Sequence, residues 1–213
     1  MSILEEMSAL LQKGRAPMVK DLVNQALEQG IAPQVILEEG LLSGMSIIGE
    51  KFKKNEVFVP EVLIAARAMN AGVEILRPHL VSSGVKNKGT VIIGTVRGDL
   101  HDIGKNIVKM MLEGKGLEVI DLGVDVAPEK FTAAAKENNA DIICLSSLLT
   151  TTMFEMKNVV EQAEKDGIRE QVKIMVGGAP ITQSFCDSIG ADCYTPDAAS
   201  CSDAALEICT NKN

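Results

Sequence analysis

From residue 90 onward, short apolar runs alternate with amphipathic segments of helical period. Runs that are almost wholly apolar are typical of strands buried on both faces of a parallel sheet. The predicted strands are 90–96, 117–122, 141–146, 172–176 and 192–195, and the predicted helices are 103–114, 128–138, 153–166, 182–189 and 200–209. Five such units predict an α/β domain with a flavodoxin-like (Rossmann-like) five-stranded parallel sheet, in which the first and third strands flank the ligand-binding crevice.

About the first eighty residues carry helical periodicity only. Apolar stripes with this period lie within 3–11, 19–27, 37–52 and 62–76. Four amphipathic helices with short connections predict an N-terminal four-helix bundle. Periodicity is lost between residues 81 and 89, where we expect a linker. The predicted organisation is a helical cap domain (1–83), a linker (84–89) that serves as a hinge, and the sheet domain (90–213).

The composition excludes several classes of protein. The 213-residue chain has a net charge of −8, no tryptophan and one tyrosine, which argues against nucleic-acid binding. No apolar run approaches the roughly 20 residues of a membrane span, and the acidic N-terminus is unlike a signal peptide. The five cysteines are odd in number and lack C-x-x-C spacing, which predicts reduced thiols in a cytoplasmic protein rather than a zinc site.

The loop after the first predicted strand carries one of the chain's two histidines. Asp99 and His101 lie between Gly98 and Gly104 on this loop. A carboxylate that accepts the proton of one imidazole nitrogen leaves the other nitrogen available to a metal. Glycine permits unusual backbone angles and the close approach of a bulky ligand. The pattern therefore favours a metal-binding histidine, and the alternative is a local hydrogen bond between Asp99 and His101.

Two later strand ends are also candidates for ligand contact. Residues 146–152 contain five hydroxyl side chains at the end of the third strand, where the alternative is a helix cap. Gly177 and Gly178 end the fourth strand, and a tight turn would explain them equally well. The chain has neither a phosphate-binding loop of the G-x-x-x-x-G-K-[ST] type nor a G-x-G-x-x-G motif after the first strand. Nucleotide binding is therefore disfavoured.

These residues resemble a known family. The spacing Asp99-x-His101-x-x-Gly104 is similar to the D-x-H-x-x-G signature of cobalamin-binding corrinoid proteins. The hydroxyls of 146–152 and the glycine pair match the family's downstream elements, and the N-terminal helices resemble the cap domain of cobalamin-dependent methionine synthase. The resemblance spans nearly the whole chain, and it looks closest to the small methyl carriers of methylamine, methanol, betaine or methoxyaromatic methyltransferase systems.

The resemblance implies a role for each candidate residue. His101 would replace the corrinoid's own base beneath cobalt (base-off/His-on), Asp99 would hold its other nitrogen, and Thr152, where methionine synthase has serine, would bond Asp99. The displaced nucleotide tail would meet the third and fourth strand ends, and Phe58 would cover the methyl face unless it is simply bundle core. The expected cofactor contacts are Gly98, Asp99, His101, Asp102, Ile103, Gly104, Ser146, Leu148, Thr150, Thr152, Gly177, Gly178, Ala198 and Phe58, with His101 as the cobalt ligand.

The resemblance also implies a function. The chain would carry a methyl group between a substrate-specific methyltransferase and a second methyltransferase that uses tetrahydrofolate or coenzyme M, and a reductive activase would restore the cobalt. It would not be catalytic alone, because no general acid, nucleophile or substrate pocket of its own is evident. The main alternative is a cobalamin-dependent sensor, although the basic helix-turn-helix of a DNA-binding regulator is not visible. A mutase subunit and a structural protein are further alternatives.

Overall fold

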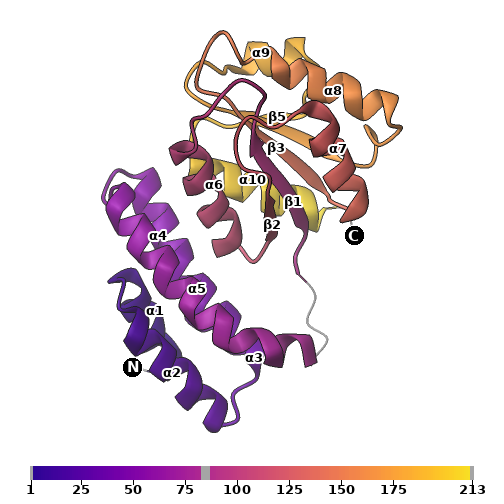
Figure 1. Ribbon diagram of the computed structural model, residues 1–213. Coiled ribbons are helices and arrows are strands. Elements are labelled where there is room, and N and C mark those ends of the chain that lie inside the picture. The colour runs from indigo at the N-terminus through magenta and orange to yellow at the C-terminus, as the bar shows by residue number, and fades with distance from the viewer. Residues whose placement is uncertain (1, 83–86, 212–213) are drawn as a thin grey trace. The chain divides into compact units, whose positions relative to one another are not determined.

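The computed structural model describes residues 2–82 and 87–211, which form two compact units (Figure 1). The first unit is helical, and the second contains the sheet with its own helices. Residues 83–86, which include the first part of the predicted linker, lie outside the described residues. The boundaries 1–83, 84–89 and 90–213, and the hinge between them, therefore stay predictions.

The helical unit corresponds to the four predicted apolar stripes. Its helices are α1 (Ile3–Gln12), α2 (Ala16–Glu28), α3 (Pro33–Val35), the π-helix η1 (Ile36–Leu42), α4 (Ser43–Lys53) and α5 (Val59–Ser82). The third stripe is thus a composite of α3, η1 and α4. The π-helix was not predicted, because one widened turn changes the apolar period too little to be seen in a single stripe. None of the helices in the described ranges is both long and apolar enough for a membrane span.

The second unit contains one parallel sheet. Its strands are β1 (Thr90–Thr95), β2 (Glu118–Asp121), β3 (Ile142–Ser146), β4 (Lys173–Gly177) and β5 (Cys193–Tyr194), in the order β2-β1-β3-β4-β5. This order confirms the flavodoxin-like prediction. Thr95 pairs with Ser146, and Ser146 pairs with Gly177, so the carboxyl ends of β1, β3 and β4 meet at one level of the sheet.

Helices cover both faces of this sheet (Figure 1). α6 (Ile103–Gly114) and α10 (Ala198–Thr210) pack on the face to which β1 contributes Val91 and Ile93. α7 (Pro128–Glu137), α8 (Glu155–Lys165) and α9 (Gln183–Ser188) pack on the opposite face, with Ile92 of β1. Alternate side chains of one strand therefore enter two separate cores, which explains why the strands are apolar throughout. The five cysteines lie in this unit as thiols, as predicted.

A buried ion pair fastens the start of α6 to the end of β2. Both carboxylate oxygens of Asp121 accept hydrogen bonds from Lys105 Nζ at 2.7 Å. Burial alone would raise the pKa of Asp121, but the bonds from Lys105 and the Gly123 amide, with the charge of Lys109, lower it overall. Because α6 begins two residues after His101, this pair also helps to locate the loop that carries the histidine.

A second aspartate ties β4 to β5. The side chain of Asp192 accepts from the Ile174 amide at 2.8 Å and lies 2.9 Å from Arg169 Nη1 and 3.2 Å from Lys173 Nζ. Burial opposes ionisation, but these donors and charges outweigh it and hold the pKa of Asp192 below its ordinary value. A carboxyl whose pKa is lowered by folding stabilises the fold above its unfolded pKa, near 4. That contribution disappears as the pH falls through the folded pKa.

We therefore expect the cofactor-free protein to lose stability below about pH 4, and Asp192→Asn to lose part of this pH dependence. Urea unfolding between neutral and acid pH is followed by the fluorescence of Tyr194, the only tyrosine in a chain without tryptophan, which lies in β5. Asp187→Asn, at an exposed position in α9, is the control. We expect it to keep the wild-type dependence of the free energy of unfolding on pH. If the free energy of unfolding of Asp192→Asn depended on pH as steeply as that of wild type, the lowered pKa of Asp192 would not be a source of this dependence.

Candidate functional site

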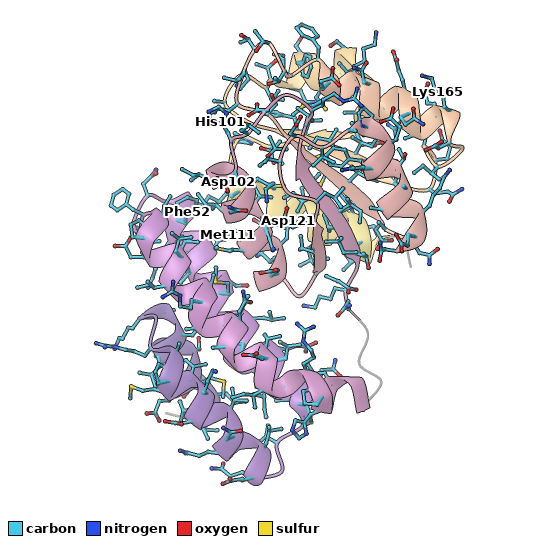
Figure 2. The ribbon with its side chains drawn as sticks, in the orientation of Figure 1. Phe52, His101, Asp102, Met111, Asp121 and Lys165 are labelled. Carbon is cyan, nitrogen blue, oxygen red and sulfur yellow. The ribbon has the colours of Figure 1, made fainter. Side chains whose placement is uncertain are left out.

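The loop between β1 and α6 presents His101 at the carboxyl edge of the sheet (Figure 2). His101 Nδ1 lies 2.7 Å from Asp99 Oδ1, and the His101 amide donates to the same oxygen at 3.1 Å. The Asp99 side chain is fully buried, whereas that of His101 is 51% exposed. The hydroxyl of Thr95, at the end of β1, donates to the His101 carbonyl at 2.8 Å. The predicted Asp–His pairing is thus present, and the sheet holds it directly.

The second oxygen of Asp99 is bound by the loop after β3. Asp99 Oδ2 accepts from the Leu148 amide at 2.8 Å, from Thr152 Oγ1 at 2.9 Å and from Ser147 Oγ at 3.2 Å. The bond from Thr152 is the one that the resemblance implied. Asp99 therefore links the loops that follow β1 and β3, on either side of the crevice where ligands bind in this fold.

These hydrogen bonds determine the charge of Asp99 and the tautomer of His101. Burial would raise the pKa of Asp99, but the donors on the His101 and Leu148 amides, the imidazole and Thr152 lower it well below its ordinary value. An ionised carboxylate only accepts hydrogen bonds, so Nδ1 of a neutral His101 must carry the proton. The lone pair then lies on Nε2, which is the arrangement of a metal-binding histidine.

The surroundings of the ring fit a large, flat, apolar ligand. Four apolar side chains next to the two loops are exposed: Leu100, Ile103, Leu148 and Leu149. A Cβ built on Gly104 would meet no atom within 4 Å, so a side chain there would enter open space. A half-exposed imidazole on a loop with exposed apolar side chains, close to the open space at Gly104, fits the binding of a corrinoid.

The other residues predicted on the first loop have distinct positions. Gly98 has a φ of +81°, which favours glycine, whereas Gly104 is not among the glycines with positive φ. Asp102 Oδ2 accepts from Asn106 Nδ2 at 3.2 Å and so supports the start of α6. Ile103 is exposed. The structure therefore places these four residues on the histidine loop and the first turn of α6, and their contact with a cofactor stays a prediction.

At the end of β3, Asp99 has a serine contact that was not predicted, because Ser146 was expected at the nucleotide tail and no role was assigned to Ser147. Ser147 is buried and contacts Asp99, whereas the predicted Ser146 is the last residue of β3 and pairs with Gly177. Two adjacent serines are indistinguishable in a single sequence, because only the exact end of the strand decides which one turns inward. Thr150 is exposed. The contact of Thr95 with the His101 carbonyl was also not predicted. The position of Thr95 at the end of the first strand, just before the histidine loop, could have indicated it.

The remaining candidates lie farther along the chain. Gly177 ends β4, and Ala198 is the first residue of α10, partly buried. Phe58 lies in the helical unit, where its amide donates to Glu61 Oε2 at 3.0 Å. Its side chain is 65% exposed, so the alternative of plain bundle core is wrong. Contact of these residues with a cofactor stays a prediction.

Gly178 is required by the fold itself. It has a φ of +134°, and a Cβ added there would lie 1.8 Å from the carbonyl oxygen of Ser147. We expect Gly178→Ala to lower the free energy of unfolding of the cofactor-free protein by about 2–4 kcal/mol, because it adds both backbone strain and a steric overlap. Urea unfolding measures this loss.

Gly177→Ala is the matched control, since its Cβ would meet only the Thr195 carbonyl oxygen, at 4.0 Å. We expect that variant to stay within about 1 kcal/mol of wild type. Equal effects of the two substitutions would show that the close approach of Gly178 to Ser147 does not limit stability.

Comparison with known proteins agrees with this geometry. A model described as a B12 binding domain matches residues 89–201, and a second model with the same description matches residues 3–77. Trimethylamine corrinoid protein 2 of Methanosarcina acetivorans is 48% identical over 183 residues, covering 85% of this chain and 84% of that protein. Dimethylamine corrinoid protein 2 of the same organism is 43% identical over 216 residues, covering 100% of both.

A solved structure is also similar over nearly the whole chain. A chain of the methanol:cobalamin methyltransferase complex MtaBC from Methanosarcina barkeri matches with a TM-score of 0.88 at 30% identity. The match covers 97% of this chain and 79% of that one. Because the B12 binding models match both parts of the chain, and its relatives are corrinoid proteins of equal extent, the chain belongs to the family of cobalamin-binding corrinoid proteins.

Proposed function

We propose that this protein carries a methyl group on the cobalt of a bound corrinoid between two methyltransferases. The observation that carries the proposal is the His101–Asp99 pair, with Nδ1 held 2.7 Å from a buried carboxylate and the ring half exposed among apolar side chains. When bound, the corrinoid supplies a cobalt centre that accepts and releases a methyl group, and the protein orients and tunes it.

We infer that His101 binds cobalt through Nε2, in the base-off/His-on state. Asp99 keeps the ring in the tautomer with a proton on Nδ1 and makes the imidazole a stronger donor. Thr152, Ser147 and the Leu148 amide hold Asp99 in place from the loop after β3. The hydrogen bonds to Asp99 thus determine how strongly His101 can donate to the metal, while the cofactor provides the reactive metal.

Roles farther from His101 rest on the resemblance and the strand ends. Ser146, Thr150, Gly177, Gly178 and Ala198 would surround the displaced nucleotide tail. The common level at which Ser146 and Gly177 end their strands supports a slot between β3 and β4. Phe58 would lie over the methyl face, and its exposure supports a role outside the core of the helical unit.

We propose that the methyl donor is a methylated amine. Relatives at 48% and 43% identity are named as trimethylamine and dimethylamine corrinoid proteins, which supports this class of donor. The partners would be an amine-specific methyltransferase, a second methyltransferase that uses tetrahydrofolate or coenzyme M, and a reductive activase. The five cysteines, odd in number and without C-x-x-C spacing, support a cytoplasmic location for such a carrier.

An anaerobic assay tests this function. The protein is loaded with cobalamin and reduced, and its absorbance is followed with an extract of methylamine-grown methanogen cells and one donor at a time: mono-, di- or trimethylamine, or methanol. If the reduced-cobalt spectrum disappears with a single one of these amines, the result supports the carrier role and identifies the donor. An unchanged spectrum with every donor, in an extract that consumes the same donors, would contradict it.

A further inference from the structure

The peptide that carries Asp99 is held by a loop on the other side of β1. Residues 122–127 connect β2 to α7, and Asp125 of this loop makes two hydrogen bonds to the histidine loop. Its Oδ1 accepts from the Gly98 amide at 2.7 Å, and its own amide donates to the Asp99 carbonyl at 3.0 Å. One residue therefore binds both Gly98 and Asp99, and so limits how the Asp99 side chain can turn.

The backbone of Asp125 is unusual. Its φ of 53° places it with Asn55 and Asn139 as the non-glycine residues of positive φ among those described. Such a conformation is unfavourable for a residue with a Cβ and persists only where neighbouring contacts impose it. Aspartate tolerates it better than most residues. Strain of this kind is common at sites where a loop must be held in one geometry.

The neighbours of Asp125 supply these contacts. On one side of it the Gly123 carbonyl accepts from the Thr95 amide at 3.0 Å, and on the other the Val126 amide donates to the Thr95 carbonyl at 3.0 Å. The loop is thus bonded to the end of β1 both before and after Asp125. Thr95 is also the residue whose hydroxyl holds the His101 carbonyl. The β2–α7 loop and the histidine loop therefore share one anchor.

We propose that Asp125 is a positioning residue for the cobalt ligand. It holds the Gly98–Asp99 peptide so that Asp99 Oδ1 meets His101 Nδ1, and it acts through Asp99 without contacting the corrinoid. The inference rests on the proposed function in one respect, that His101 binds cobalt. Asp125 is exposed, so replacing it removes no core packing and tests the hydrogen bond itself.

Three substitutions separate the roles of the side chain and the backbone. Asp125→Asn keeps a carbonyl oxygen as acceptor and tolerates positive φ. Asp125→Gly keeps the backbone conformation but removes the acceptor, and Asp125→Ala removes both. Asn139→Gly is the matched control, because Asn139 also has positive φ (47°) but lies before β3, at the opposite edge of the sheet.

The protein is labelled with 15N-histidine, loaded with cobalamin and reduced to cobalt(II), and the readout is electron paramagnetic resonance. A 15N-histidine ligand splits each line into a doublet, whereas the corrinoid's own 14N base would split it into a triplet. Asp125→Gly is expected to lower the ratio of histidine-bound to histidine-free cobalt by about tenfold while the thermal midpoint of the cofactor-free protein stays near that of wild type. Asp125→Ala is expected to lower both this ratio and the thermal midpoint, whereas Asp125→Asn and Asn139→Gly keep the wild-type ratio.

The outcomes are distinguishable. A wild-type ratio in Asp125→Gly would overturn the positioning role alone, since His101 would still be the ligand. An equal loss in Asp125→Gly and Asn139→Gly would also overturn it. If wild-type protein binds cobalamin without the doublet from 15N-histidine, the His-on assignment of the proposed function fails, and the positioning role fails with it. Normal splitting in a protein that accepts no methyl group would contradict only the carrier function.

Discussion

Replacing His101 with alanine is expected to abolish the doublet from 15N-histidine in the cobalt(II) signal while the protein still binds cobalamin. Cofactor binding should survive, because the exposed apolar side chains and the strand ends that we propose surround the corrinoid remain. Methyl transfer should slow by about 10- to 100-fold, the range seen when tuning contacts of a metal are lost. Paramagnetic resonance and the anaerobic transfer assay measure the two effects on the same sample.

The other histidine provides the control for this experiment. His79 lies in the last turn of α5, in the helical unit, and is exposed. We expect His79→Ala to keep both the splitting and the transfer rate. A wild-type spectrum in His101→Ala would exclude His101 as the ligand. Loss of the histidine splitting in His79→Ala would show that His79 is the cobalt ligand instead.

Asp99→Asn is expected to weaken histidine ligation and to destabilise the protein even without cofactor. Asp99 Oδ1 faces donors on His101, and Oδ2 faces donors on Leu148 and Thr152. An asparagine amide has only one acceptor oxygen, so one set of donors must face its NH2 group in either orientation. Leaving buried donors unpaired costs about 1–3 kcal/mol, and the ratio of histidine-bound to histidine-free cobalt should fall by about 10-fold or more.

Asp102→Asn removes a charge from the same loop without this conflict, because Asp102 is exposed and bonds only the side chain of Asn106 among the contacts described for its carboxylate. Urea unfolding of the cofactor-free proteins and paramagnetic resonance of the loaded ones compare the two variants. If Asp99→Asn behaved like Asp102→Asn in both measurements, the buried hydrogen bonds of Asp99 would not be what holds the ligand.

The sequence predicted the architecture well because the relevant signals are local or periodic. Apolar runs and helical stripes marked all five strands and the helices around them, and strand–helix alternation predicted the order β2-β1-β3-β4-β5. The Asp99–His101 pair was also predictable, since two residues on one loop meet whenever that loop curls. The π-helical segment Ile36–Leu42 escaped notice, because its effect on the apolar period is small.

The residues that support this pair depend on contacts distant in sequence. Ser147 bonds Asp99, a contact that the resemblance did not imply, because β3 ends at Ser146 and Ser147 begins the following loop. Asp125 lies 26 positions after Asp99, on the loop after an edge strand, and no spacing rule joins them. Gly178 looked like a ligand-lining residue, but its proximity to the Ser147 carbonyl gives it a role in the fold as well.

The sequence by itself therefore determined the fold class and the chemistry at the end of β1, because both are written in residues close together along the chain. Tertiary structure alone decided which groups hold Asp99 ionised and His101 in one tautomer. The physical reason is that these groups come from the ends of three strands that hydrogen bonding across the sheet brings to one edge.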